Sequence, residues 1–144
     1  MVKHFVIVSG LPASGKSRLA QKVSNAIGLR LFDKDDFLEE LFKKKGVGDT
    51  EWRRALSREA DTLFQIAALE SDCALLVSWW KHPLSLEQSG TPIDWLMPFG
   101  SSSVEIYCKC DVVSAVRRFM SRDRHPGHLD NLRSYDALLE SFKA

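Results

Sequence analysis

The sequence is poor in cysteine, has no long apolar run and carries almost no net charge. Its three cysteines, among 144 residues, form an odd set without the C-x-x-C spacing of a zinc or redox site. No stretch reaches the about 18 apolar residues of a membrane span, and no signal sequence precedes the first apolar run. The formal charge of +1 is too small to indicate a nucleic-acid or membrane surface by bulk electrostatics. We therefore expect a cytoplasmic protein with reduced thiols, in which local groups hold any anionic ligand.

The remaining composition suits one small domain. Hydrophobic residues make up 44% of the chain and charged residues 27%, enough for a core and a solvated surface. Strand-like apolar runs alternate with helix-like stripes, which is typical of an α/β protein with a parallel sheet. We expect a single domain over residues 1–144 in which about four parallel strands are flanked by helices.

The pattern predicts the position of each element. Strands are expected at residues 4–9, 29–32, 74–79 and 104–109, and helices at 16–27, 37–45, 50–70, 112–122 and 132–142. Residues 81–101 are expected to be largely irregular, with a short helix near 93–97. Cys108 and Cys110 are expected as buried thiols on one face of the last strand. The core stripe expected on the long helix consists of Trp52, Leu56, Ala60, Leu63, Phe64 and Ala67.

The most specific motif is the run Gly-Leu-Pro-Ala-Ser-Gly-Lys-Ser at residues 10–17, directly after the first strand. The backbone N–H groups of such a loop turn toward a phosphate, and glycine is needed where a Cβ would block the approach. Lys16 would contact the β and γ phosphates, and Ser17 would give its hydroxyl to Mg²⁺. A glycine-rich turn without a ligand is the alternative, but strand and helix flank the motif as its mechanism requires. The predicted nucleotide-binding residues are Gly10, Pro12, Ala13, Ser14, Gly15, Lys16 and Ser17.

Three aspartates follow the second expected strand, at the sheet edge where ligands bind in open α/β folds. Asp33 suits a magnesium ligand. Asp35 suits the base that accepts the proton of an attacking hydroxyl during phosphoryl transfer. Asp35 or Asp36 could instead cap the helix that follows, and capping is the role we expect for Asp36.

Arginines gather late in the chain, just before the turn at Pro126 and Gly127. A guanidinium that closes over a bound nucleotide stabilises the charge of the transferring phosphoryl group and excludes water. We therefore expect a lid at about residues 118–130, with Arg122 as a catalytic group and Arg118 as a nucleotide contact one helical turn earlier. Arg117 fits a solvated helix end, which is also a strong alternative for Arg124.

Other polar and aromatic residues leave more than one interpretation open. His125 and His128 are expected as loop residues rather than metal ligands. Trp79 and Trp80 cannot both face the same way on a strand, so one of them could line an acceptor pocket. An arginine that binds the acceptor could lie at the start of the long helix, although exposed charges are commoner there; the candidates are Arg53, Arg54 and Arg58.

Together these segments resemble the small P-loop kinases that act on metabolites and related acceptors, such as gluconate kinase, shikimate kinase, chloramphenicol phosphotransferase and the kinase domain of polynucleotide kinase. The phosphate-binding loop, the Asp33–Asp35 pair and the lid arginines carry this resemblance, which spans nearly the whole chain. It implies the three-layer P-loop nucleoside triphosphate hydrolase fold with ATP and Mg²⁺ as cofactors. It also implies that Asp35 contacts the acceptor hydroxyl and that Arg122 contacts the phosphates.

The sequence departs from this family in two places. Such kinases usually have a fifth parallel strand after the lid, whereas residues 132–142 are expected to be helical, so either the sheet is reduced or the sequence is a piece of a longer chain. No acidic residue ends the third expected strand, which offers only Ser78. A guanine-reading Asn-Lys-x-Asp string is also absent, which disfavours a GTPase.

We expect a phosphotransferase that moves the γ-phosphate of Mg-ATP to a hydroxyl of a small molecule. The alternative is an ATP-binding module or switch with little or no transfer activity. The small net charge argues mildly against a polynucleotide end as the acceptor, which stays open.

Overall fold

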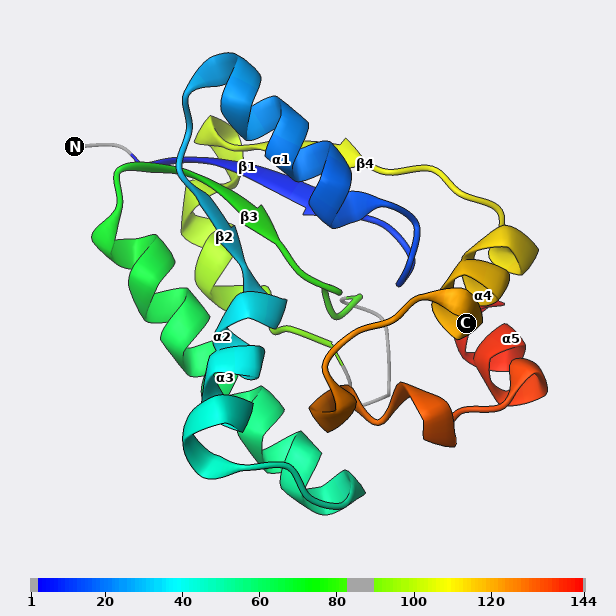
Figure 1. Cartoon of the computed structure of the whole chain (residues 1–144). Helices are drawn as coiled ribbons and strands as arrows, with labels where there is room; N and C mark the ends of the chain where they lie inside the picture. Colours follow the sequence, from blue (N-terminus) through cyan, green and yellow to red (C-terminus); the bar gives the residue numbers. More distant parts are fainter. Residues whose placement is uncertain (1–2, 83–89, 144) are drawn as a thin grey trace.

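A sheet of four parallel strands forms the centre of the computed structural model, which describes residues 3–82 and 90–143 (Figure 1). The strands are β1 (His4–Ser9), β2 (Leu31–Asp33), β3 (Cys73–Val77) and β4 (Val104–Tyr107), in the order β2-β3-β1-β4. Their parallel pairing confirms the predicted fold class. Residues 83–89 of the expected irregular segment lie outside the described residues.

The first three helices lie between the first three strands, as parallel pairing requires, and the last two helices follow β4. The helices are α1 (Lys16–Ile27), α2 (Lys34–Lys45), α3 (Thr50–Glu70), α4 (Val112–Ser121) and α5 (Tyr135–Lys143). Short 3₁₀ turns are η1 (Asp94–Ser102), η2 (Pro126–His128) and η3 (Asp130–Leu132). Within the described residues, no helix combines the length and apolarity that crossing a membrane requires.

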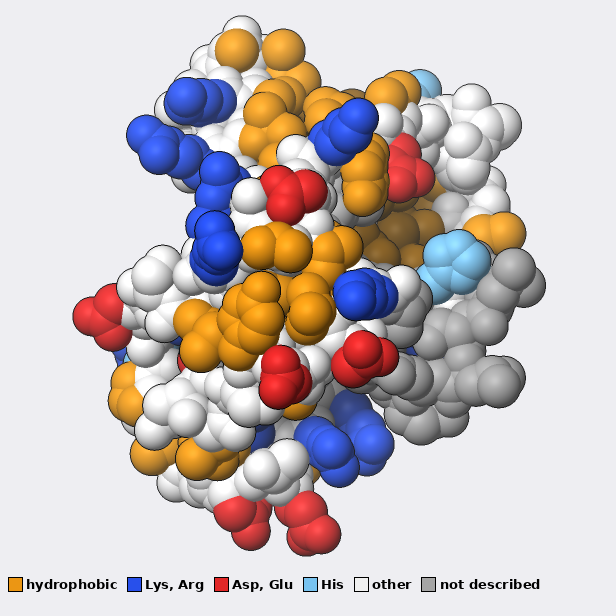
Figure 2. All heavy atoms as spheres, turned by 90° about the vertical axis from the view of Figure 1, so that its right-hand side faces the viewer, with side chains coloured by type: hydrophobic (Ala, Val, Ile, Leu, Met, Phe, Trp, Pro, Cys, Tyr) orange, Lys and Arg blue, Asp and Glu red, His pale blue; other side chains and the backbone are white. Residues whose placement is uncertain are grey.

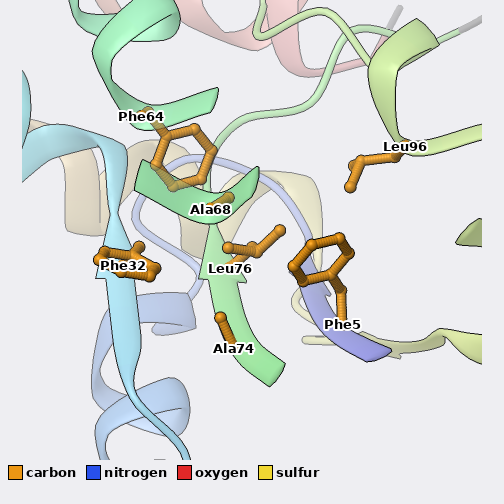
Figure 3. Close-up of a cluster of buried hydrophobic side chains, with 7 residues drawn as sticks. All are labelled: Phe5, Phe32, Phe64, Ala68, Ala74, Leu76 and Leu96. Atoms are coloured by element: carbon orange, nitrogen blue, oxygen red, sulfur yellow. The ribbon is translucent and has the colours of Figure 1, made fainter. Parts of the chain in front are cut away.

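The side chains of β1 alternate between the two faces of the sheet, which produces three layers. Val6 and Val8 face α1, where they pack with Ala20 and Leu75. On the opposite face, buried side chains from three strands pack against α3 and η1 (Figure 3). That cluster consists of Phe5, Phe32, Phe64, Ala68, Ala74, Leu76 and Leu96.

The buried stripe of α3 differs in part from the predicted one. Its fully buried members recur at a spacing of four residues: Leu56, Ala60, Phe64 and Ala68. The first two pack against α2 and the last two against the sheet. Trp52 and Leu63 were expected inside but are 37% and 39% exposed, because they lie beside this stripe. The Trp52 indole instead donates a hydrogen bond to the Gly46 carbonyl at 2.9 Å.

Two strands end earlier than expected, and the prediction for the cysteines is wrong. β3 ends at Val77, which pairs with the last residue of β2, and β4 ends at Tyr107, which pairs with the last residue of β1. Cys108 and Cys110 therefore follow the strand and are half-buried. Because β4 is an edge strand, Val104 and Tyr107 on it are mainly exposed. Figure 2 shows that hydrophobic side chains gather on the side of the molecule where α4 and α5 lie.

Candidate active site

The loop between β1 and α1 has the backbone of an anion cradle. Gly10 and Gly15 adopt φ angles of +140° and +100°, which favour glycine, and Ala13 is also left-handed at 59°. A Cβ on Gly10 would lie only 2.7 Å from the Cys108 carbonyl oxygen, so that position requires glycine. The buried Ser14 hydroxyl has no hydrogen-bond partner among the described residues. The loop therefore offers a shaped space and a free polar group to a ligand.

Lys16 is held inside this loop. Its side chain is nearly buried, and its Nζ donates a hydrogen bond to the Gly10 carbonyl at 2.9 Å. Burial lowers the pKa of Lys16 to about 8, although Asp35 and Asp33 oppose this shift. The ammonium group therefore keeps most of its positive charge at neutral pH.

Ser17 and Asp33 meet at the end of β2. The Ser17 hydroxyl donates to Asp33 Oδ2 at 2.5 Å, and burial raises the pKa of Asp33 to about 6. Asp33 also caps α2, because its Oδ1 accepts from the Asp35 N–H at 3.0 Å. The expectation that Asp36 is the cap is wrong: the helix begins at Lys34, directly after the extended Asp33, so Asp36 lies within the first turn and is exposed.

The donor set at this point suits a magnesium ion bound mainly through phosphate. No group of three or more histidine, cysteine or acidic side chains that could hold a metal occurs within residues 3–82 and 90–143. Mg²⁺ is usually held by one or two carboxylates together with water and substrate phosphates. The Ser17 hydroxyl and the Asp33 carboxylate fit that pattern.

Asp35 is connected by Arg124 to the segment that follows α4. The Arg124 guanidinium donates to both oxygens of Asp130, at 2.6 and 2.7 Å, and its third bond reaches Asp35 Oδ2 at 3.1 Å. The expected alternative of a solvated surface charge is therefore wrong for Arg124. Its side chain is only 18% exposed, because its paired carboxylates enclose it.

Two further arginines, one on α4 and one at its C-terminal end, approach the phosphate-binding loop. Arg118 Nη1 lies 3.5 Å from the Ser14 carbonyl oxygen. Arg122 is half-buried, and its charge lowers the pKa of Lys16, which indicates that the two groups are close. Its Nε has no hydrogen-bond partner in the described structure, since Asp130 Oδ2 is 3.7 Å away. The guanidinium lies over the Phe119 ring, 4.4 Å from its centroid.

These groups line one cleft of about 1090 Å³ at the carboxyl ends of the strands. Trp79 lines this cleft, whereas Trp80 packs in the core and donates to the Val8 carbonyl. The two tryptophans therefore face different ways, as predicted. The predicted site residues on the wall are Pro12, Ala13, Gly15, Lys16, Ser17, Asp33, Asp35, Arg118 and Arg122.

Sequence reasoning missed several residues of the cleft. Arg133 and the buried His128 line it, and so do the three arginines of α3 that were left open: Arg53, Arg54 and Arg58. His128 was expected to be a polar loop residue, but its side chain is 1% exposed against the Phe42 ring. The sequence signal for this contact was the apolar face of α2, to which Leu38 and Phe42 belong. An apolar helix face has to be covered by another segment of the chain.

A further polar network lies on the wall of the cleft, where β3 ends. Lys34 Nζ lies 3.0 Å from Asp61 Oδ1 and donates to the Ser57 hydroxyl at 2.7 Å. Thr91 donates to the same Asp61 oxygen at 2.8 Å and lies 2.5 Å from the Ser78 hydroxyl. One oxygen of Asp61, Oδ1, is therefore engaged by two of its neighbours.

No family model matches the sequence, and no curated protein sequence is significantly similar to it. Solved structures do match. A protein from Chloroflexus aurantiacus, provisionally described as a kinase, is 25% identical with a TM-score of 0.80, over all of this chain and 80% of its own. Shikimate kinase from Bacteroides thetaiotaomicron is 15% identical with a TM-score of 0.57, over 96% of this chain and 75% of its own. A sugar kinase from Janibacter is 16% identical with a TM-score of 0.51, over 98% and 92%.

These matches agree with the geometry of the loop and the sheet. The matches to shikimate kinase and the sugar kinase have such low sequence identity that they show a shared fold alone. The match to the Chloroflexus protein covers the whole chain. The chain therefore has the fold of the P-loop kinases, which confirms the resemblance predicted from the sequence.

Proposed function

We propose that this chain is an ATP-dependent phosphotransferase that acts on a hydroxyl of a small molecule. The observation that carries this proposal is the convergence of Lys16, the Ser17–Asp33 pair and Asp35 at one edge of the sheet. A cradle for phosphate, a metal-binding pair and a separate carboxylate are the parts that phosphoryl transfer needs. We also propose that residues 1–144 act as one domain with a lid at about 118–130, working in the cytoplasm, where three free cysteines are compatible with a reducing environment.

The loop from Gly10 to Ser17 would hold the triphosphate. Its left-handed glycines turn backbone N–H groups inward, and Lys16 adds a point charge. Ser17 and Asp33 would hold Mg²⁺, which when bound neutralises charge on the phosphates. A metal there also relieves the burial of the Asp33 carboxylate, whose raised pKa reflects that it now lacks a full counter-charge.

Asp35 would act as the base. The acceptor oxygen attacks the γ-phosphorus and its proton passes to Asp35, while the bond from the γ-phosphorus to the bridging oxygen breaks and ADP leaves. Asp35 suits this role because it lies between the Lys16 side of the cleft and Arg124. Arg122 would stabilise the transferring phosphoryl group, and Arg118 would contact the nucleotide beside Ser14.

One contact favours the second candidate function, an ATP-binding switch without transfer. The Arg124–Asp35 bond occupies an oxygen of the proposed base. If that bond persists when substrates are bound, the carboxylate is a weaker proton acceptor and closure of the lid becomes the main response to ATP.

Turnover with matched variants tests the proposal. ADP formation from Mg-ATP is measured with a panel of hydroxyl compounds for the wild type and for Lys16→Ala and Asp35→Asn, beside ATP affinity by calorimetry. We expect Lys16→Ala to lose ATP binding, and Asp35→Asn to bind ATP normally but lose acceptor-stimulated turnover by a factor of about 10² or more. Full transfer by Asp35→Asn would refute the base assignment, and ATP binding without turnover on any acceptor would favour the switch.

A further inference from the structure

The strand β4 has a free edge. In the order β2-β3-β1-β4 it is the last strand, so one of its sides has no neighbouring strand among the residues that the structure describes (Figure 1). β4 contains no proline, and its Val104 and Tyr107 side chains are each 61% exposed. β-Branched and aromatic residues favour strand pairing, and the unpaired N–H and C=O groups of an edge can bind another strand. This edge is therefore suited to pairing with a further strand.

The backbone of β4 decides which residues would make that pairing. The N–H and C=O groups of successive strand residues point alternately to the two sides of the strand. The Cys108 N–H donates to the Ser9 carbonyl at 2.8 Å, so Cys108 and Ile106 turn their backbone groups toward β1. Glu105 and Tyr107 therefore turn theirs toward the free edge. Lys109 follows in the same alternation.

The side chains of these three residues share one face of the sheet. Ile106 packs on the side of α1, so Glu105, Tyr107 and Lys109 lie on the opposite face. All three are exposed, whereas Ile106 is half-buried. The edge thus presents an acidic, an aromatic and a basic side chain in a row.

The two charges of this row have no ionic partner within residues 3–82 and 90–143. Neither Glu105 nor Lys109 forms a salt bridge there. The Ser9 hydroxyl donates to Glu105 Oε2 at 2.7 Å and holds the carboxylate on this face. Because Glu105 and Lys109 lie two residues before and two residues after Tyr107, the row is complementary in charge to its own antiparallel copy.

We propose that β4 pairs antiparallel with β4 of a second copy of this chain, about a two-fold axis at Tyr107. In this register Glu105 of each copy lies opposite Lys109 of the other, and the two Tyr107 side chains are neighbours across the axis. The pairing joins two four-stranded sheets into one continuous sheet. It goes beyond the proposed phosphotransferase function and does not depend on it.

Other antiparallel registers within β4 leave the charges unsatisfied. Residues that face the free edge have to meet one another, which restricts the axis to Glu105, Ile106 or Tyr107. An axis at Glu105 puts two carboxylates directly opposite, which destabilises the pair. An axis at Ile106 puts each Glu105 opposite a Tyr107 ring. Only the axis at Tyr107 gives both charges an opposite partner.

Exchange of the two charges tests the proposal. Sedimentation velocity of the chain is measured from about 5 to 500 μM at low salt, where we expect a dimer with a Kd of about 10–100 μM because the pairing is short. Glu105→Lys and Lys109→Glu each create two like-charge contacts and should raise the Kd about tenfold or more. The double variant restores both ion pairs in reverse and should return to within about threefold of the wild type.

The matched control is Glu70→Lys, which makes the same change of charge at an exposed residue that ends α3. Its Kd should equal that of the wild type. A wild type that stays monomeric up to about 500 μM would overturn the proposal and leave the edge of β4 to a different segment. A double variant as weak as the single variants, or a dimer that none of the changes weakens, would overturn it as well.

Disulfide trapping tests the register. Two Tyr107 residues that meet on the axis have Cα atoms about 5.5 Å apart, which a disulfide spans. We therefore expect Tyr107→Cys to form a covalent dimer on oxidation, seen by electrophoresis without reductant. Glu105→Cys is the control, since its two copies would be about 13 Å apart along the strands, and the wild type shows the background from its own cysteines. A covalent dimer of Glu105→Cys but not of Tyr107→Cys would refute the axis at Tyr107.

Discussion

At the residue scale, the ionised carboxylate of Asp33 is buried, and this charge is unfavourable for folding. This carboxylate is buried beside Ser17, and burial raises its pKa to about 6. A group whose pKa is higher in the folded state binds its proton more tightly there, so folding loses stability as pH rises from about 4 to 6. The fold therefore tolerates an ionised Asp33 at neutral pH as a cost of its proposed role.

Replacing Asp33 with asparagine removes that cost. Asparagine still caps α2 and accepts from Ser17, so we expect Asp33→Asn to be more stable than the wild type by about 1–2 kcal/mol at pH 8. The gain is smaller than the full pKa shift implies, because Lys16 loses a nearby negative charge. Urea denaturation at pH 8 and pH 4 measures it.

The difference between the two proteins should nearly vanish at pH 4, where the wild-type carboxyl is protonated. Mg-ATP should stabilise the wild type more than Asp33→Asn, since the variant lacks the carboxylate that we propose as a metal ligand. A variant that is less stable than the wild type at both pH values would contradict this account of Asp33.

Arg122 provides a second prediction at this scale. Its guanidinium is held over Phe119, next to Lys16, and its Nε has no hydrogen-bond partner among the residues that the structure describes. We expect Arg122→Ala to lower kcat by a factor of about 10³ or more while changing ATP affinity much less, because the charge that we propose Arg122 stabilises develops only during transfer. Steady-state kinetics measure this. Arg117→Ala is the control, and an equal kcat in both variants would reduce Arg122 to a structural role.

At the scale of elements, the turn at residues 125–128 is anchored on α2. Gly127 packs so closely on the Phe42 ring that a Cβ on it would lie 2.5 Å from a ring carbon. His125 stacks on the same ring, with centroids 5.2 Å apart, and His128 meets it edge-on at 5.3 Å. One phenylalanine thus holds three residues of the turn.

His128 makes this anchor sensitive to acid. Burial and the charge of Arg124 lower the pKa of His128 to about 4, against the opposing effects of Asp35 and Asp130. Glu39 faces it at 3.8 Å. His128 takes up a proton near pH 6.5 in the unfolded chain but only near pH 4 in the folded protein. The contribution of the neutral ring to the free energy of unfolding is therefore fully present above pH 6.5 and is lost as pH falls toward 4.

We therefore expect His128→Gln, which cannot be protonated, to lose less stability than the wild type between pH 7.5 and pH 4. The free-energy difference between the two proteins should change by about 2–3 kcal/mol over this range. Urea denaturation at several pH values measures it, with His125→Gln as the control. A constant difference across the range would show that the His128 ring is not neutral in the folded protein.

Most helices could be predicted from the sequence because their signals are local. The α3 range of residues 50–70 was predicted with the bounds that the structure has. The ends of β3 and β4 could not be predicted in this way. Each of these strands ends where it pairs with the last residue of a neighbouring strand, which lies far away in the sequence. The exposure of Trp52 likewise depends on the end of α2, because its indole bonds to Gly46 there. The spacing of apolar residues along α3 does not reveal this contact.

At the scale of the whole molecule, the cleft concentrates positive charge that the composition conceals. The net charge of +1 led to the expectation that local groups hold any anionic ligand, and ten cationic side chains meet at one cavity. The phosphate loop could be predicted because its residues are adjacent in sequence. The sequence could not predict that one cleft contains Arg53, Asp35 and Arg124, because they come from three separate segments.

This concentration of charge predicts a strong dependence on salt. We expect the affinity for ATP without Mg²⁺ to fall about tenfold or more between roughly 0.05 and 0.5 M KCl, since salt screens exposed charges. Calorimetry at several salt concentrations measures it. Lys22→Gln, a change outside the cleft wall, should keep the same slope. A flat dependence in the wild type would mean that the cleft arginines do not attract the nucleotide.

The two bonds from Arg124 to Asp130 and the packing of Gly127 on Phe42 also bear on how fast ligands enter. They hold the segment after α4 against α2 without any ligand. Asp35 is 45% exposed on the cleft wall, but a molecule that binds its Oδ2 has to displace the Arg124 bond as well as water. Electrostatic attraction then shortens the search for the cleft, whereas release of this bond is a separate step of binding at Asp35.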